Sequence, residues 1–198
     1  CNSLDCEYLP LNMGDYSLVI TNCKKPHSLV ESKYNERRAE TETALELLQK
    51  HIDIKCLADL SLSRFEKYSG MFSEPVKKRV EHVVTECERV REATLALKAG
   101  DMVKLGKLLN ASHKSLKELY EVTGFEPDAL AEAAQSQTCC LGSRLIGGGF
   151  GGCTISIVKS DCVDEFKEAT YNAYLKATGY KAEFYSSDIS DGITVEKL

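Results

Sequence analysis

Five glycines occupy the six positions from 147 to 152, inside the segment SRLIGGGFGGCTISIV (143–158). Glycine adopts positive φ angles without strain and lets a ligand come within hydrogen-bonding distance of the backbone. Successive N–H groups in such a loop can line a concave anion site. A hairpin turn needs only one or two glycines, so this loop leaves two interpretations open, a ligand-facing loop and a turn packed against another backbone. The candidate loop consists of Gly147, Gly148, Gly149, Phe150, Gly151 and Gly152.

The loop partly matches two phosphate-binding motifs. Gly147, Gly149 and Gly152 satisfy G-x-G-x-x-G, but that motif needs a helix at its third glycine, whereas CTISIV has the composition of a strand. The outer frame of the Walker A motif, G-x-x-x-x-G-K-[ST], also fits, but Cys153 stands where a lysine would contact phosphate. Neither motif therefore explains the loop.

A second group of candidate residues lies near position 35. Tyr34, taken alone, is typical of a partly buried helix tyrosine whose hydroxyl reaches water. Arg37 and Arg38 could contact a phosphate, but a pair of arginines on a helix is usually solvated or ion-paired. Acidic residues close by favour that second interpretation, namely Glu36, Glu40 and Glu42.

Two histidines and a serine–arginine pair complete the candidates. His113, in ASHKS, could act as a base by residue type, but we expect a hydrogen-bonded structural histidine. His82 falls among valines and is expected to pack within the core or between helices. Ser143 and Arg144 lead into the glycine loop, where they either order the loop or form the edge of a sheet.

The middle of the chain has the periodicity of helices. We expect one helix from about 27 to 51 and a longer one between Pro75 and Gly100, because proline suits a first turn and glycine an end. The expected inner face of the longer helix repeats at steps of four and three: Val76, Val80, Val83, Cys87, Val90, Thr94 and Leu97.

Two further helices are expected before the glycine loop. Asp101 is a suitable N-cap for the first, and Pro127 is expected to open the second, which ends near Gln137. The expected inner face of the first consists of Leu105, Leu109, Leu116 and Leu119.

Strands are expected near the start of the chain and in its last third. β-Branched, aromatic or alternating residues predict strands at 16–22, 153–158, 182–187 and 192–197, with another leading into the glycine loop. A helix capped by Ser160 is expected to run to Gly179 between two of them. This order indicates an antiparallel or mixed sheet backed by helices, an α+β fold.

Composition narrows the class of protein. The 43% hydrophobic and 28% charged residues are ordinary for a globular domain. A net charge of −5 without a long basic run argues against nucleic-acid binding, and no apolar run approaches a membrane span. The nine cysteines form no C-x-x-C pair, so we expect reduced thiols in a cytoplasmic protein rather than a zinc site.

Five segments, in the order of the family, resemble the galactokinases of the GHMP kinase superfamily. The last of them resembles the third conserved motif of that superfamily. The segments are LDCEYLPL (4–11), SLVESKYNERRAETETA (28–44), RVEHVVTECERV (79–90), ASHKSLKELYEVTGFEPDALAEAA (111–134) and GSRLIGGGFGGCTISIV (142–158). Together they span nearly the whole chain, which makes the resemblance more specific than any single motif.

The resemblance implies a fold, a reaction and a site. The fold is a single GHMP kinase C-terminal domain over 1–198, with a helical region and a four-stranded antiparallel, ferredoxin-like sheet. The reaction transfers the γ-phosphoryl group of ATP, with Mg²⁺, to the 1-hydroxyl of galactose in the Leloir pathway. The resemblance implies that Tyr34 hydrogen-bonds the sugar and that Gly147 to Gly152 border the active site near the triphosphate.

Motifs of the family's N-terminal half, G-E-H-x-D-Y and P-x-x-x-G-L-S-S-S-A, do not occur in this sequence. The chain also begins at Cys1 rather than methionine. We therefore expect a C-terminal domain without its N-terminal ATP-binding domain, with no catalytic residue of its own, inactive alone. The expected partners are galactose, ATP and that other domain, which would supply most Mg²⁺ ligands. Two alternatives remain: an N-acetylgalactosamine kinase and a non-catalytic sensor of galactose and ATP.

Overall fold

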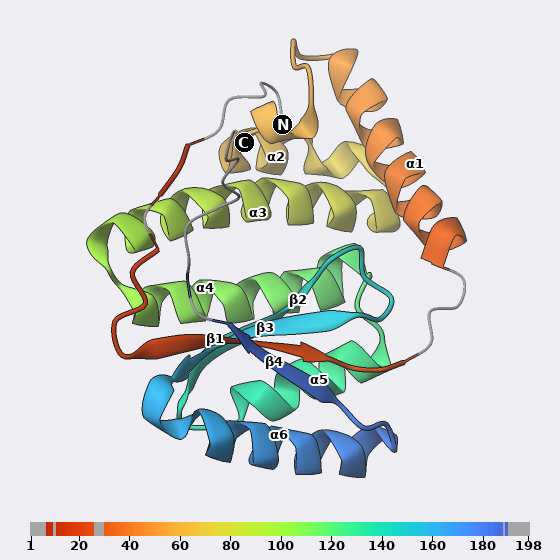
Figure 1. Ribbon diagram of the computed structural model, residues 1–198. Coiled ribbons are helices and arrows are strands. Elements are labelled where there is room, and N and C mark those ends of the chain that lie inside the picture. Colours follow the sequence, from red (N-terminus) through yellow and green to blue (C-terminus); the bar gives the residue numbers. More distant parts are fainter. Residues whose placement is uncertain (1–6, 10, 26–29, 188, 190–198) are drawn as a thin grey trace, which may run out of the picture.

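The computed structural model describes residues 7–9, 11–25, 30–187 and 189. Within this part of the chain, four strands form one antiparallel sheet in the order β2-β3-β1-β4 (Figure 1). Their bounds are β1 Tyr16–Asn22, β2 Cys140–Ile146, β3 Cys153–Lys159 and β4 Glu183–Ser187. The expected α+β fold with a four-stranded antiparallel sheet is confirmed, and the βαββαβ succession is ferredoxin-like. The strand expected at 192–197 lies outside the described residues.

Helices cover both faces of the sheet. The α-helices are α1 Val30–Gln49, α2 Leu62–Tyr68, α3 Glu74–Ala99, α4 Met102–Ser115, α5 Phe125–Gln135 and α6 Val163–Thr178. Short 3₁₀ turns lie at η1 Leu57–Asp59, η2 Ser69–Met71 and η4 Ser160–Cys162, and α4 continues into a π-helical segment, η3 Leu116–Tyr120. Figure 1 shows α5 and α6 on one side of the sheet and α4 on the other, with α3 beyond α4 and α1 and α2 farther out.

Local signals place most helix boundaries correctly. Gly100 adopts a left-handed conformation (φ 68°) and ends α3, and the Asp101 side chain accepts a hydrogen bond from the Lys104 N–H at 2.8 Å. Two expected starts are displaced. Pro127 lies in the first turn of α5 rather than opening it. Ser160 begins a 3₁₀ turn, and α6 itself starts at Val163.

Apolar side chains pack on both faces of the sheet, and a further group packs among the outer helices. Below the sheet, Val19 and Val158 pack with Phe166 of α6. Above it, Ile157 packs with Met102 of α4. The other group lies among the outer helices and contains Ala44, Leu48, Ile54, Leu57, Leu60, Phe65, Phe72, Val80 and Val84.

The expected inner faces of α3 and α4 are only partly correct. Val80 is fully buried, but Val90 is 63% exposed, because α3 extends past the helices that pack on its first half. The α-helical part of α4 ends before Leu116, and its buried positions near that end are polar: Ser112, His113 and Ser115. These polar side chains are buried because they form hydrogen bonds with neighbouring groups. Their positions follow no apolar periodicity, so the sequence does not predict their burial.

α4 approaches β2 closely at a pair of glycines. A Cβ atom added to Gly142 would overlap the Gly106 carbonyl group, and one added to Gly106 would lie 2.6 Å from the Leu141 carbonyl carbon. Both obstacles are backbone, so neither can turn aside as a side chain would. The two glycines therefore set how closely the helix lies on the strand.

Gly142→Ala is expected to lower the free energy of unfolding by about 3 kcal/mol, because relieving the overlap requires α4 and β2 to separate. Urea denaturation measures this loss. Gly70→Ala is the control, since a Cβ there meets nothing within 4 Å, and it should change stability by less than about 0.5 kcal/mol. Equal stability of the two variants would contradict the close approach.

Candidate functional site

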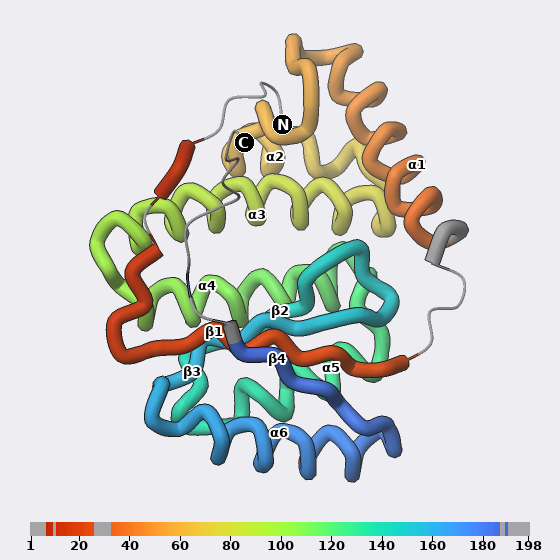
Figure 2. The backbone as a smooth tube through the Cα atoms, viewed as in Figure 1, coloured from red at the N-terminus to blue at the C-terminus, as the bar shows by residue number. Residues whose placement is uncertain are grey.

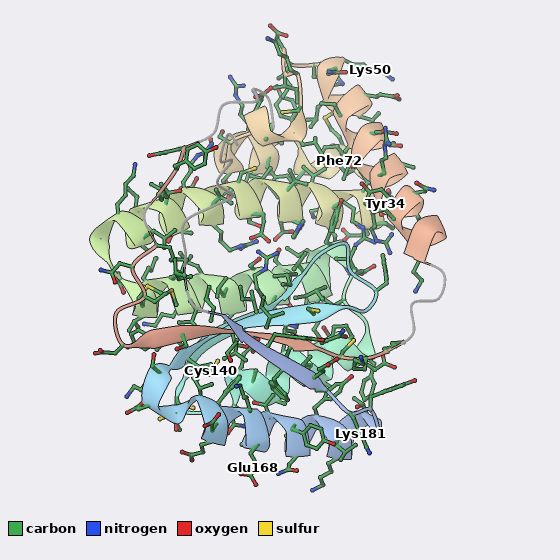
Figure 3. The ribbon with its side chains drawn as sticks, in the orientation of Figure 1. Tyr34, Lys50, Phe72, Cys140, Glu168 and Lys181 are labelled. Atoms are coloured by element: carbon green, nitrogen blue, oxygen red, sulfur yellow. The ribbon has the colours of Figure 1, made fainter. Side chains whose placement is uncertain are left out.

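A cavity of about 440 Å³ lies between α1, the π-helical segment and the β2–β3 loop. Figure 2 shows the β2–β3 hairpin reaching toward the end of α1 where that helix begins. Tyr34, labelled in Figure 3, lies near this end of α1. The described residues that line the cavity are Tyr34, Arg37, Arg38, Thr41, Leu116, Tyr120, Val122, Gly147 and Gly148. The fold thus brings Tyr34 and the glycine loop, far apart in sequence, to one space.

The glycine loop connects β2 to β3 and has an unusual backbone. Positive φ angles occur at Gly147, Gly149, Phe150, Gly151 and Gly152 (90°, 89°, 58°, 137° and 92°). Such angles are strained for residues with a Cβ atom, which explains why glycine fills all of these positions except one. The glycines therefore allow a specific backbone conformation and do not only make the loop flexible.

The two halves of the loop have different surroundings. Gly147 and Gly148 are exposed and line the cavity. The second half is held by the protein: the Phe150 N–H donates to the Val122 carbonyl oxygen at 2.7 Å, and a Cβ on Gly149 would overlap that same oxygen. The packed-turn interpretation is therefore confirmed for the second half of the loop. The ligand-facing interpretation stays a prediction for the first half, which lines the cavity.

α1 supplies the opposite wall of the cavity. Tyr34 is 56% exposed. Arg37 is buried and donates to Glu40 at 2.8 Å, and the exposed Arg38 donates to Glu42 at 2.7 Å. The expected ion pairs are thus confirmed. The groups of this wall that remain available to a ligand include the Tyr34 phenol.

A buried ion-pair network stands behind the cavity. The Arg79 side chain, 2% exposed, bonds Glu40 of α1 at 2.7 Å and Glu121 at 2.8 Å, and its Nη1 donates to the Leu119 carbonyl oxygen. Sequence reasoning missed this network. Arg79 follows two lysines in KKRVEHVV, a run that resembles a solvated helix face.

His82 and Tyr120 pack face to face beneath the cavity. Their rings lie 4.5 Å apart, nearly parallel, and His82 Nδ1 lies 2.8 Å from Ser115 Oγ. Burial lowers the pKa of His82 to about 4, so the ring is neutral at pH 7. Burial likewise raises the pKa of Tyr120. The expected packing role of His82 is confirmed, although its partners here are polar and aromatic.

The remaining candidate residues, His113, Ser143 and Arg144, lie within the framework of the fold. The Leu145 N–H donates to His113 Nδ1 at 3.2 Å, which leaves the ring proton on Nε2, 3.4 Å from Asp128. Ser143 and Arg144 lie in β2, an edge strand of the sheet. None of these three candidates lines the cavity.

The described residues contain neither a metal-binding cluster nor a membrane-spanning helix. No group of three or more histidine, cysteine, aspartate or glutamate side chains there has the geometry to hold a metal ion. None of the helices in the same part of the chain combines the length and the hydropathy of a membrane span.

Comparison with known proteins finds relatives that match nearly the whole chain. Residues 93–176 match the family described as GHMP kinases C terminal. The galactokinase of Lactobacillus helveticus is 48% identical over 193 residues, which cover 97% of this chain and 50% of that protein. This chain carries a GHMP kinase C-terminal domain. The matched residues include the end of α3, α4, α5, β2, β3 and most of α6.

Other relatives of the GHMP domain agree. The galactokinase of Enterococcus faecalis is 47% identical over 96% of this chain and 50% of its own length. A crystal structure of Lactococcus lactis galactokinase complexed with galactose superposes with a TM-score of 0.93 at 47% identity, covering 97% of this chain and 50% of that one. The chain thus spans about half the length of the relatives it matches.

Two alanine substitutions should separate the halves of the glycine loop. Gly149→Ala is expected to cost about 2–3 kcal/mol of stability, because it adds a clash with Val122 to a φ of 89°. Gly148→Ala should change stability by less than about 0.5 kcal/mol, since open space surrounds that position. Urea unfolding of both variants tests this, and equal losses would show that the second half is not held as described.

His82 should make the stability of the domain depend on pH. The folded-state pKa of about 4 lies below the ordinary 6.5, so the unfolded chain binds more protons between these values and stability falls as pH decreases through that window. Between pH 7 and pH 5 the loss due to this residue is about 2 kcal/mol. His82→Gln should remove that part of the slope in urea titrations, whereas His51→Gln, at an exposed position, should retain it. An unchanged slope in His82→Gln would contradict a buried neutral ring.

Proposed function

We propose that this chain is the C-terminal half of a galactokinase, which transfers the γ-phosphoryl group of ATP to the 1-hydroxyl of galactose in the cytoplasm. The observation that carries the proposal is the near-half identity to galactokinases along 97% of the chain. The cavity supports it, because the two elements that the sequence resemblance selects, Tyr34 and the glycine loop, share one space.

Tyr34 is suited to bind a sugar hydroxyl in this proposal. Its phenol can donate or accept a hydrogen bond, and more than half of its surface is exposed at the cavity. It sits on a helix whose next turns are fixed by ion pairs. A rigid helix positions such a group better than a mobile loop, and rigid positioning increases both affinity and rate.

The glycine loop would border the sugar and the phosphate chain. Gly147 and Gly148 present backbone without side chains to the cavity, so a ligand can approach their peptide groups closely. Peptide dipoles held in one orientation stabilise negative charge without having to reorganise during the reaction. ATP supplies the phosphoryl group that is transferred, and Mg²⁺ neutralises charge on its phosphates.

In this proposal the chain contributes one wall of a larger site. Glu40 and Glu42 of α1 are ion-paired with the cavity-lining Arg37 and Arg38, and no described cluster could hold a metal ion. We therefore assign the catalytic residues and the Mg²⁺ ligands to an N-terminal domain of the full-length protein. Because phosphoryl transfer depends on positioning and charge stabilisation, residues 1–198 alone should be inactive.

Coupled ADP-release assays test the proposal. The full-length protein should release ADP with galactose, and residues 1–198 alone should not. Turnover with N-acetylgalactosamine instead would indicate a kinase for that sugar, and binding of sugar and ATP without turnover would indicate a sensor. Either result, or turnover by 1–198 alone, would overturn the proposal.

Tyr34→Phe in the full-length protein is expected to raise the KM for galactose about 5- to 30-fold, because one hydrogen bond to the sugar is lost. The KM for ATP should change little. Tyr180→Phe is the matched control, since that tyrosine follows α6 and is absent from the cavity lining. Galactose saturation curves provide the measurement, and an unchanged KM in Tyr34→Phe would exclude the sugar contact.

A further inference from the structure

We propose that Arg79 is a positioning residue that fixes the two walls of the cavity relative to each other. One wall is α1 with Tyr34, and the other is the glycine loop. The kinetic consequences of this role rest on the proposed function, but its structural consequence does not. Arg79 itself is absent from the cavity lining, so it would act through the groups that it holds.

One guanidinium joins three segments. Arg79 projects from α3, its Nε bonds Glu40 Oε2 at 2.7 Å, and its Nη2 bonds Glu121 Oε2 at 2.8 Å. Its Nη1 donates to the carbonyl oxygen of Leu119, in the π-helical segment. The guanidinium is planar and presents its donors in a fixed fork. The positions of α1 and of the turn after the π-helical segment are therefore set against one rigid group.

The link to Tyr34 runs along α1. Glu40 lies six positions after Tyr34 on the same helix and also accepts a hydrogen bond from Arg37 at 2.8 Å. Tyr34 and Arg37 both line the cavity. A shift or rotation of α1 about this anchor would therefore move the phenol relative to the opposite wall.

The link to the glycine loop runs through the turn at Glu121. Glu121 has a left-handed backbone conformation (φ 56°). Its own carboxylate bonds Arg79, and this bond holds the turn in place. The hydrogen bond from Arg79 also lowers the pKa of Glu121. Val122 follows directly, and its carbonyl oxygen accepts the Phe150 N–H at 2.7 Å. A displacement of the turn would thus also displace the glycine loop, because the Val122–Phe150 hydrogen bond joins the two.

The partners of Arg79 keep other cations when it is removed. Glu40 retains Arg37 at 2.8 Å, and Glu121 retains Lys78 at 3.2 Å. No carboxylate of the network is left as a buried unpaired charge, which is the usual reason that such a substitution unfolds a protein. Arg37 Nη2 also lies 3.9 Å from Glu121 Oε2, so a weaker link between α1 and the turn remains. Loss of Arg79 should therefore loosen the two walls relative to each other while the fold persists.

The test compares Arg79→Met and Arg79→Lys in the full-length protein by hydrogen exchange and by kinetics. In Arg79→Met the Phe150 amide should exchange at least about tenfold faster, the KM for galactose should rise about tenfold, and kcat should fall. Arg79→Lys should show intermediate values, because one ammonium cannot reproduce the fork. Unchanged Phe150 exchange in Arg79→Met would overturn the proposal.

Two controls separate positioning from general stability. Val80→Ala alters the adjacent residue, which is fully buried in the outer apolar cluster. It should lower the melting temperature without changing Phe150 exchange or the KM. Arg91→Met removes an exposed ion pair on the same helix and should leave both readouts unchanged. If Val80→Ala reproduced the Arg79→Met effects, Arg79 would be merely structural, and the proposal would fail.

The proposed function and the positioning role can fail separately. If the unmodified full-length protein showed no galactose-dependent turnover, the kinase proposal would fall. The exchange rate of the Phe150 amide would still decide whether Arg79 holds the loop, because that measurement needs no substrate.

Discussion

The backbone contact between Val122 and the glycine loop is the constraint on which the site depends. The Val122 carbonyl oxygen accepts the Phe150 N–H and lies against the Cα of Gly149. It joins the segment after the π-helical turn to the tip of the β2–β3 hairpin, whose Gly152 also accepts a hydrogen bond from the Cys23 N–H at 3.0 Å. The contact requires a residue without Cβ at 149, and the hairpin requires positive φ at most of its other positions. These two requirements account for the glycines of the loop except Gly148, which has no positive φ and has open space around it.

Sequence reasoning succeeded where the cause of a structure is local. Gly100 ends α3 and Asp101 caps α4 because a left-handed residue and a short acceptor side chain act within one turn. It was less accurate where the cause is tertiary. Val90 continues the apolar periodicity of α3, yet it is exposed. The apolar cluster of the outer helices reaches along α3 only to Val84, and α4 contacts the following part of α3 through Glu86 and Glu92 rather than Val90. Periodicity shows which side of a helix could be buried, and the length of the neighbouring elements decides how much of that side is covered.

The same distinction applies to the site. The glycine loop is visible from composition, and family resemblance selects Tyr34 and implies one site for both. Residue spacing and periodicity alone do not bring the two together. Arg79 could not be recognised as buried, because two preceding lysines give it the pattern of a solvated face. Its burial depends on Glu40 and Glu121, which come from other segments. A buried charge is acceptable only with such partners, and partners distant in sequence leave no spacing pattern.

The electrostatics of the cavity indicate what its wall can recognise. Arg37 and Arg38 are engaged by carboxylates, so the phenol of Tyr34 and the peptide groups of Gly147 and Gly148 are neutral groups left facing the space. In the proposed function, neutral donors and acceptors at fixed positions would discriminate among the hydroxyl groups of a sugar, because an unmatched polar group costs more than a matched one gains. Their geometry matters more than their charge. A wall of this kind therefore depends on the network behind it, where Arg79 holds both sides in place.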